Sequence, residues 1–170
     1  DGLDVAQIDP MDVRRNVGYL PQETHLFRGR LRDNLRVSSL DLSDEALMEA
    51  LDFSGLAGFV RTHPEGLDLP IADGGGGLST GQKVAVGLAR LYLQDPSIVL
   101  MDEPTAALDQ QAEAAFINKL EKWLGDRTCI VATHRTAILS QMDQVGLLKD
   151  GVLIVVGPRD AVLERLKANT

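Results

Sequence analysis

The stretch Ser97–Pro104, which reads SIVLMDEP, is an apolar run that ends in two carboxylates and a proline. Such a run predicts a strand buried on both faces, as in a parallel sheet covered by helices. Ligands of α/β proteins bind at the carboxyl ends of these strands. Asp102 could hold a Mg²⁺ there, while Glu103 could orient or deprotonate a water. A strand end with two solvated acids is the alternative that this motif alone leaves open.

The composition limits the class of protein. The chain has 170 residues, 44% of them hydrophobic, which is enough for one globular core. Its 17 basic and 25 acidic residues give a net charge of −8, which argues against nonspecific binding of nucleic acid. The single cysteine, Cys129, lies in an apolar run and predicts a buried, reduced thiol. No apolar run approaches the roughly 20 residues that a membrane helix needs.

The first residues predict a turn, a strand and a short helix, followed by a second strand. Asp1-Gly2 resembles the end of a hairpin turn, and Val5–Ile8 is expected to be the returning strand. Asp9-Pro10 is a typical helix start, with the helix ending near Asn16. Val17–Leu20 is then expected to be a second buried strand. Because the chain has no starting Met and opens on a turn, we expect it to be part of a longer protein.

The middle of the chain is helical. From Thr24 to about Gln94 the pattern contains no convincing strand and predicts a helical lobe inserted into an α/β core. Leu26 and Phe27 are expected to be buried anchors, and Ser43 to begin an amphipathic helix. Just before this lobe, Gln22 follows the second strand, where its amide could reach a metal or a water.

A glycine-rich stretch, residues 73–77, precedes a helix expected to begin after Ser79 and to run to Leu93. Free amides, a positive dipole end and a hydroxyl make such a helix start an anion site. A capped helix after a loose linker is the alternative. Gly87 inside this helix costs about 1 kcal/mol relative to Ala and indicates close packing.

A second strand end should meet the first. Residues 105–109 read as a tight loop, and Gln111–Leu124 as an amphipathic helix. Thr128–Ala132 is the next expected buried strand, and His134 follows it. If the strands are parallel, His134 emerges at the same sheet edge as Asp102 and Glu103. The rest of the chain predicts a hairpin, over 145–148 and 152–156, and a terminal helix over 160–167.

Taken in order, these motifs resemble the nucleotide-binding domain of an ATP-binding cassette (ABC) transporter, and the resemblance covers essentially the whole chain. The matching positions are the Q-loop at Gln22, the signature motif at Leu78–Gln82, the Walker B strand at Ile98–Asp102 with its catalytic carboxylate at Glu103, the D-loop at Ala106–Asp109 and the switch histidine at His134.

This resemblance implies the mostly parallel α/β core of a P-loop NTPase with an inserted helical lobe. No G-x-x-x-x-G-K-[ST] motif occurs among the 170 residues, so the resemblance also implies a domain truncated at its N-terminus. Residues 1–170 would be the C-terminal portion of one ABC ATPase domain. Its helical lobe would span about 24–94, and its core 1–23 and 95–170.

The resemblance also implies roles for single residues. Glu103 and His134 would be catalytic, and Asp102 and Gln22 would hold Mg²⁺. ATP would be bound by Gln22, Ser79, Thr80, Gly81, Gln82 and Asp109. The complete protein would be an ATPase at the cytoplasmic face of the inner (cell) membrane, and this piece alone would be inactive. Its partners would be a second nucleotide-binding domain in a homodimer and an exporter's transmembrane domain, with no nucleic acid.

Some details refine or oppose this resemblance. Pro21–Gly29, followed by Arg32-Asp33-Asn34, resembles exporter-type domains. Pro70–Gly75 does so too, and there type I secretion and bacteriocin exporters are similar. Thr80 stands where the family usually has Gly, and Lys83 where Arg is common. The alternatives are an ABC-type ATPase of DNA maintenance or repair, and a degenerate, non-hydrolysing cassette that acts as an interaction domain.

Overall fold

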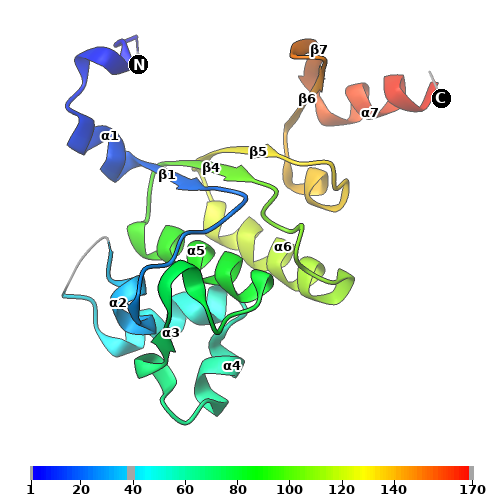
Figure 1. The fold of residues 1–170 in the computed structure, drawn as a ribbon. Coiled ribbons are helices and arrows are strands. Elements are labelled where there is room, and N and C mark those ends of the chain that lie inside the picture. The colour runs from blue at the N-terminus through cyan, green and yellow to red at the C-terminus, as the bar shows by residue number, and fades with distance from the viewer. Residues whose placement is uncertain (1, 38–40, 169–170) are drawn as a thin grey trace. The chain divides into compact units, whose positions relative to one another are not determined.

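The structure is a computed structural model that describes residues 2–37 and 41–168 (Figure 1). The chain divides into two compact units, residues 1–134 and 135–170, and each is described separately. Among the described residues, the helices are too short or too polar to cross a membrane.

A parallel sheet of three strands forms the centre of the first unit, in the order β1–β4–β5. The strands are β1 (Val17–Leu20), β4 (Ile98–Asp102) and β5 (Thr128–Ala132). Leu20 of β1 pairs with Met101, and Met101 pairs with Val131 of β5. The three predicted strands and their parallel direction are therefore confirmed, and their carboxyl ends share one edge.

Among the described residues of the first unit, helices cover only one face of this sheet. Figure 1 shows α5 (Thr80–Gln94) and α6 (Gln110–Leu124) on the same side of the strands. Val99 and Met101 are buried on that side, whereas Tyr19 and Ile130 on the other face are each 60% exposed. The prediction that these strands are buried on both faces is wrong for the first unit, because none of its described helices packs on the second face.

The helices between residues 31 and 62 pack with α5 around an apolar cluster. Leu31, Leu35, Leu47 and Leu51 are fully buried in it and meet Val86 of α5. The helices are α2 (Leu31–Leu35), α3 (Asp44–Phe53) and α4 (Ala57–Thr62), and a two-stranded antiparallel sheet joins β2 (Gly29–Arg30) to β3 (Pro70–Ile71). The sequence did not predict these two strands, because two residues are too short to show a periodicity.

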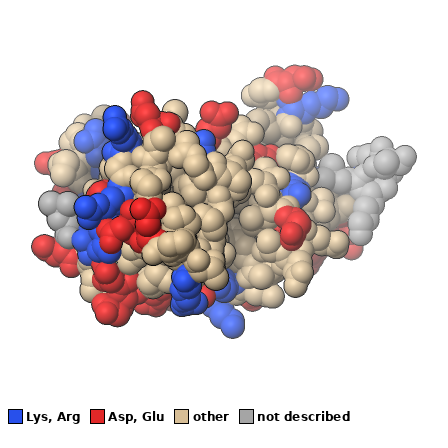
Figure 2. All heavy atoms as spheres, turned by 60° about the horizontal axis from the view of Figure 1, so that its bottom comes forward, with Lys and Arg blue, Asp and Glu red and all other residues tan. Residues whose placement is uncertain are grey.

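Charged and aromatic contacts connect the helices of the first unit. Asp68 and Asp44 accept hydrogen bonds from Arg32 at 2.8 and 2.9 Å, which ties α2 to α3. On the described part of the face in Figure 2, basic side chains are interspersed with acidic ones. The ring centre of Phe53 on α3 lies 5.2 Å from that of Trp123 on α6, so these two helices are packed together.

Two local predictions near the first strands are wrong. Val5–Gln7 is a 3₁₀ turn rather than a strand: the Asp4 carboxylate accepts a hydrogen bond from the Ala6 amide, and a strand needs a partner that the described residues do not provide. Phe27 is 45% exposed, whereas its neighbour Leu26 is buried as expected. The helix α1 (Pro10–Asn16) begins as predicted, with Asp9 as its N-cap.

Cys129 is the second residue of β5 and pairs with the buried Val99 of β4. Its thiol is free and partly buried, and burial raises its pKa to about 11. The predicted burial of Cys129 is therefore only partial, and its reduced state stays a prediction.

The second unit is a hairpin followed by a helix. Its strands β6 (Gln144–Lys149) and β7 (Val152–Pro158) pair antiparallel, and α7 (Arg159–Ala168) follows. Asp150 and Gly151 connect the strands with φ values of 50° and 77°. Both residues take the left-handed conformation that tight hairpin turns require, so the predicted hairpin is confirmed.

The packing of α5 gives a matched pair of glycine substitutions. A methyl group at Gly87 would lie 2.5 Å from Thr24 Oγ1 and 2.7 Å from Leu20 Cδ1, whereas one at Gly58 in α4 would contact nothing within 4 Å. We expect Gly87→Ala to lower the free energy of unfolding by about 1–3 kcal/mol through overpacking. Gly58→Ala should raise it by up to about 1 kcal/mol, because alanine favours helix. Urea denaturation measures both, and equal effects would contradict the packing.

Candidate functional site

Glu103 is the residue at which the central strand turns away from the sheet. Its amide donates to the Ala132 carbonyl at 2.9 Å, which extends the pairing with β5 by one residue. Its own carbonyl accepts from the Ala106 amide at 3.1 Å and closes a turn. The φ of Glu103 is 47°, a conformation that is uncommon for residues other than glycine. This backbone sends the Glu103 side chain in a different direction from that of Asp102.

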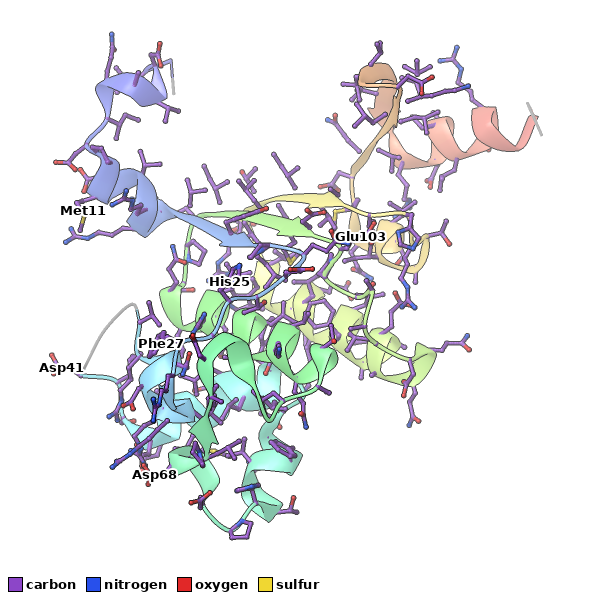
Figure 3. All side chains as sticks on the ribbon, in the orientation of Figure 1. Met11, His25, Phe27, Asp41, Asp68 and Glu103 are labelled. Atoms are coloured by element: carbon purple, nitrogen blue, oxygen red, sulfur yellow. The ribbon has the colours of Figure 1, made fainter. Side chains whose placement is uncertain are left out.

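Three hydrogen bonds hold the Glu103 carboxylate. Thr133 Oγ1 donates to Oε2 at 3.0 Å, and the His134 amide donates to Oε1 at 3.1 Å. In its Nδ1–H tautomer the His134 ring also donates to Oε1, across 2.7 Å. The predicted catalytic pair is therefore in direct contact at the end of β4 (Figure 3).

The environment of Glu103 favours its charged form. The side chain is 16% exposed, and this burial raises the pKa. The hydrogen bonds from His134 and Thr133 outweigh burial, and the net result is a pKa below the ordinary value. His134 differs, because its side chain is 77% exposed and contacts the carboxylate from the solvent side.

Asp102 and Gln22 emerge at the same edge of the sheet. Leu20 lies beside Met101 in the parallel register, so Gln22, two residues beyond Leu20, leaves the sheet next to Asp102. The described residues contain no group of three His, Cys, Asp or Glu side chains able to hold a metal by themselves. A carboxylate and an amide oxygen are nevertheless the hard donors that suit Mg²⁺, whose other ligands are often phosphates and water.

The start of α5 is a reciprocal capping box. Ser79 Oγ accepts from the Gln82 amide at 3.3 Å, and Gln82 Oε1 accepts from the Ser79 amide at 2.8 Å. The amides of Thr80 and Gly81 belong to the first turn, whose N–H groups have no carbonyl partner inside a helix. The predicted N-cap is confirmed. The return bond from Gln82 was missed, although the S-x-x-Q spacing indicates it.

The loop before α6 touches the start of α5. A methyl group at Gly81 would lie 3.4 Å from the Ala107 carbonyl oxygen, so the two segments are packed closely. Asp109 accepts a hydrogen bond from the Ala112 amide at 2.8 Å and caps α6. The predicted ATP-binding residue Asp109 therefore has a structural partner inside its own chain.

The structure thus brings the predicted site residues together in two groups, apart from Asp109, which caps α6. One group lies at the sheet edge and contains Gln22, Asp102, Glu103 and His134, to which Thr133 is added. The other lies at the start of α5 and contains Ser79, Thr80, Gly81 and Gln82. Thr133 was missed by sequence reasoning, and its only signal was a hydroxyl directly before the histidine at a strand end.

Comparisons with known proteins agree with this geometry. The family model described as "ABC transporter" matches residues 1–106. The "ABC-type transporter fsqE" of Aspergillus fumigatus is 36% identical over 165 residues, covering 96% of this chain and 13% of that protein. "ATP-binding cassette sub-family B member 6" of Homo sapiens is 34% identical, covering 97% of this chain and 20% of the relative.

A solved structure resembles the fold closely. The chain matches the "Structure of a bacterial Atm1-family ABC exporter with ATP bound" with a TM-score of 0.90 and 29% identity, over 97% of this chain and 29% of the other. The chain therefore spans less than a third of these relatives. Because the family model matches more than half of its residues, the chain belongs to the ABC transporter family and has the fold of an exporter's ATP-binding domain.

Proposed function

We propose that the complete protein hydrolyses ATP to drive export across a membrane, with Glu103 as the base that accepts a proton from the attacking water. The observation that carries this proposal is the Glu103 carboxylate, held ionised by Thr133 and His134 at the carboxyl end of β4. The relatives support the rest, because their names include ATP-binding proteins and exporters.

The remaining residues at the sheet edge are assigned by their chemistry. Gln22 and Asp102 would hold Mg²⁺, which supplies positive charge to the phosphates when it is bound. His134 is exposed enough to leave Glu103 and to donate a hydrogen bond to a phosphate instead. That exchange also frees Glu103 Oε1 to accept a hydrogen bond from water.

A second copy of the domain would complete the ATP site. The start of α5 belongs to the helical lobe, about residues 24–94, whereas Glu103 and His134 belong to the core. A head-to-tail pair with two-fold symmetry would place each lobe opposite the other core. The first-turn amides of Thr80 and Gly81, the Ser79 hydroxyl and the side chains of Gln82 and Asp109 would then meet the partner's ATP.

The transmembrane partner would dock beside Gln22. An open hollow of about 950 Å³ lies there, lined by Met11, Pro21, Val37 and others. Met11 is 54% exposed and Val37 is 62% exposed, so an apolar helix could bury both. This docking would place the domain at the cytoplasmic face of the cell membrane. The type I secretion assignment remains a prediction.

The first prediction concerns the base. In the complete protein, Glu103→Gln should retain ATP binding and lower kcat by about 10²–10⁴-fold, because an amide cannot accept the proton of water. Glu121→Gln, on the exposed side of α6, is the matched control and should leave turnover unchanged. Steady-state phosphate release and equilibrium nucleotide binding measure the two properties. Normal turnover by Glu103→Gln would show that Glu103 is not the base.

The second prediction concerns the composite site. We expect a mixed dimer with Ser79→Arg in one subunit and Glu103→Gln in the other to turn over ATP like a dimer of wild type with Glu103→Gln. If Ser79 serves the partner, both lesions fall on one site and the other site stays intact. If Ser79 serves its own chain, both sites are disabled. Loss of all turnover, while each wild-type/mutant dimer remains active, would contradict the arrangement.

The third prediction concerns the charge of Glu103. The carboxyl should titrate below the ordinary value of 4.5, so it remains ionised at neutral pH. The stability that its ionised form contributes is present above the unfolded pKa and is lost as the pH falls through the lower folded pKa. Thr133→Val should raise the folded pKa, because one of the hydrogen bonds that lower it is removed. Carboxyl ¹³C NMR of the chain measures both values, and an unchanged pKa would refute the assigned cause.

A further inference from the structure

Arg90, in the second half of α5, joins two segments that are far apart in sequence. Its Nε donates to the Asn34 carbonyl at 2.6 Å, one terminal nitrogen donates to the His25 carbonyl at 2.8 Å, and the other donates to Asn34 Oδ1 at 2.8 Å. The guanidinium carbon also lies 5.9 Å from the ring centre of Phe27. His25 and Phe27 lie on the segment that leads from β1 to α2 alongside α5 (Figure 3).

The side chain of Asn34 cross-links the segment that Arg90 contacts. Asn34 is fully buried, and its Oδ1 also accepts from the Phe27 amide at 3.1 Å. Its Nδ2 donates to the carbonyls of Phe27 and Arg30 at 3.0 and 3.1 Å. Residues 27–34 therefore form a loop whose two ends are joined by hydrogen bonds of the Asn34 side chain. Arg90 hydrogen-bonds this loop to α5.

The three acceptors of Arg90 carry no charge. Partial burial lowers the pKa of Arg90, and a partly buried cation without a carboxylate is costly unless its donors are well satisfied. A planar guanidinium can reach three fixed acceptors at once, whereas the single ammonium of lysine cannot do so in the same geometry. The contact therefore depends on arginine itself and not only on a positive charge.

A second contact connects the same two segments. Gly87 of α5 lies so close to Thr24 that a methyl group there would be 2.5 Å from the threonine hydroxyl. The segment is thus pressed against α5 at Thr24 and hydrogen-bonded to it at His25. Gln22 lies just before these contacts, and Ser79 stands at the start of the helix that carries Arg90.

We propose that Arg90 is a positioning residue that makes the segment after Gln22 and the helix after Ser79 move as one unit. This inference rests on the proposed function, in which Gln22 and Ser79 contact ATP in different sites of a dimer. Since a helix transmits displacement along its axis, a shift of the Gln22 segment on binding ATP moves the Ser79 turn toward the partner's nucleotide. Arg90 thereby links the occupancy of the two ATP sites.

Hydrogen exchange of the complete protein tests this link. In a Glu103→Gln background, added Mg·ATP should slow exchange in residues 22–27 and in residues 79–83 with the same midpoint concentration. In Arg90→Lys the two midpoints should separate by at least about threefold. Arg61→Lys, an exposed arginine in the last turn of α4, is the matched control and should keep them together.

Chemical rescue separates positioning from simple folding. Arg90 lines the open hollow beside Pro21, so small cations can reach its place. Methylguanidinium added to Arg90→Ala should bring the two midpoints together again, whereas methylammonium should not. Coincident midpoints in Arg90→Lys would overturn the proposal, as would a loss of protection in Arg90→Ala that methylguanidinium leaves unchanged.

A measurement without nucleotide keeps this inference distinct from the proposed function. Exchange in residues 24–28 should be at least about threefold faster in Arg90→Lys than in the parent, while exchange in α3 stays the same. Unchanged exchange in residues 24–28 would overturn the inference whatever the ATP result. Absence of any ATP effect in the parent would instead contradict the proposed function.

Discussion

The parallel register of β1, β4 and β5 is the constraint on which the site depends. Val99 and Met101 must face the helices to be buried, and this requirement fixes how β4 lies between its neighbours. A slip of one residue would turn every side chain of the strand to the opposite face. The same burial therefore fixes the position along the sheet at which each strand ends, and with it the positions of Gln22, Glu103 and His134. Apolar packing, rather than any contact between polar groups, brings the chemistry to one edge.

Much of this arrangement could be predicted because it follows from local patterns. Apolar runs gave the three strands, polar residues marked their ends, and Ser79 before a helical pattern indicated its cap. The covering of the sheet could not be predicted, because a run such as Thr128–Ala132 looks the same whether one face or both faces are covered. The prediction of a strand over Val5–Ile8 was wrong for a related reason. A strand pattern does not show whether a partner strand is available to pair with it.

The site was predictable at the level of residues but not of contacts. The shared sheet edge predicted that His134 lies near Glu103. The hydrogen bonds among Glu103, Thr133 and His134, however, depend on a left-handed backbone at Glu103, which no sequence motif predicts. Arg90 is harder still to predict. Its partners lie 56 and 65 positions away in the sequence. They are uncharged carbonyl groups, so no acidic residue indicates where Arg90 binds.

The partly buried thiol of β5 has a practical consequence for work on this protein. With a pKa of about 11, only about one in ten thousand Cys129 side chains is a thiolate at neutral pH. Since the thiolate is the reactive form, Cys129 should react very slowly with maleimides and similar reagents. It is also the single cysteine of the chain. Fluorophores or spin labels can therefore be attached to a cysteine introduced on the surface, with the natural residue left in place.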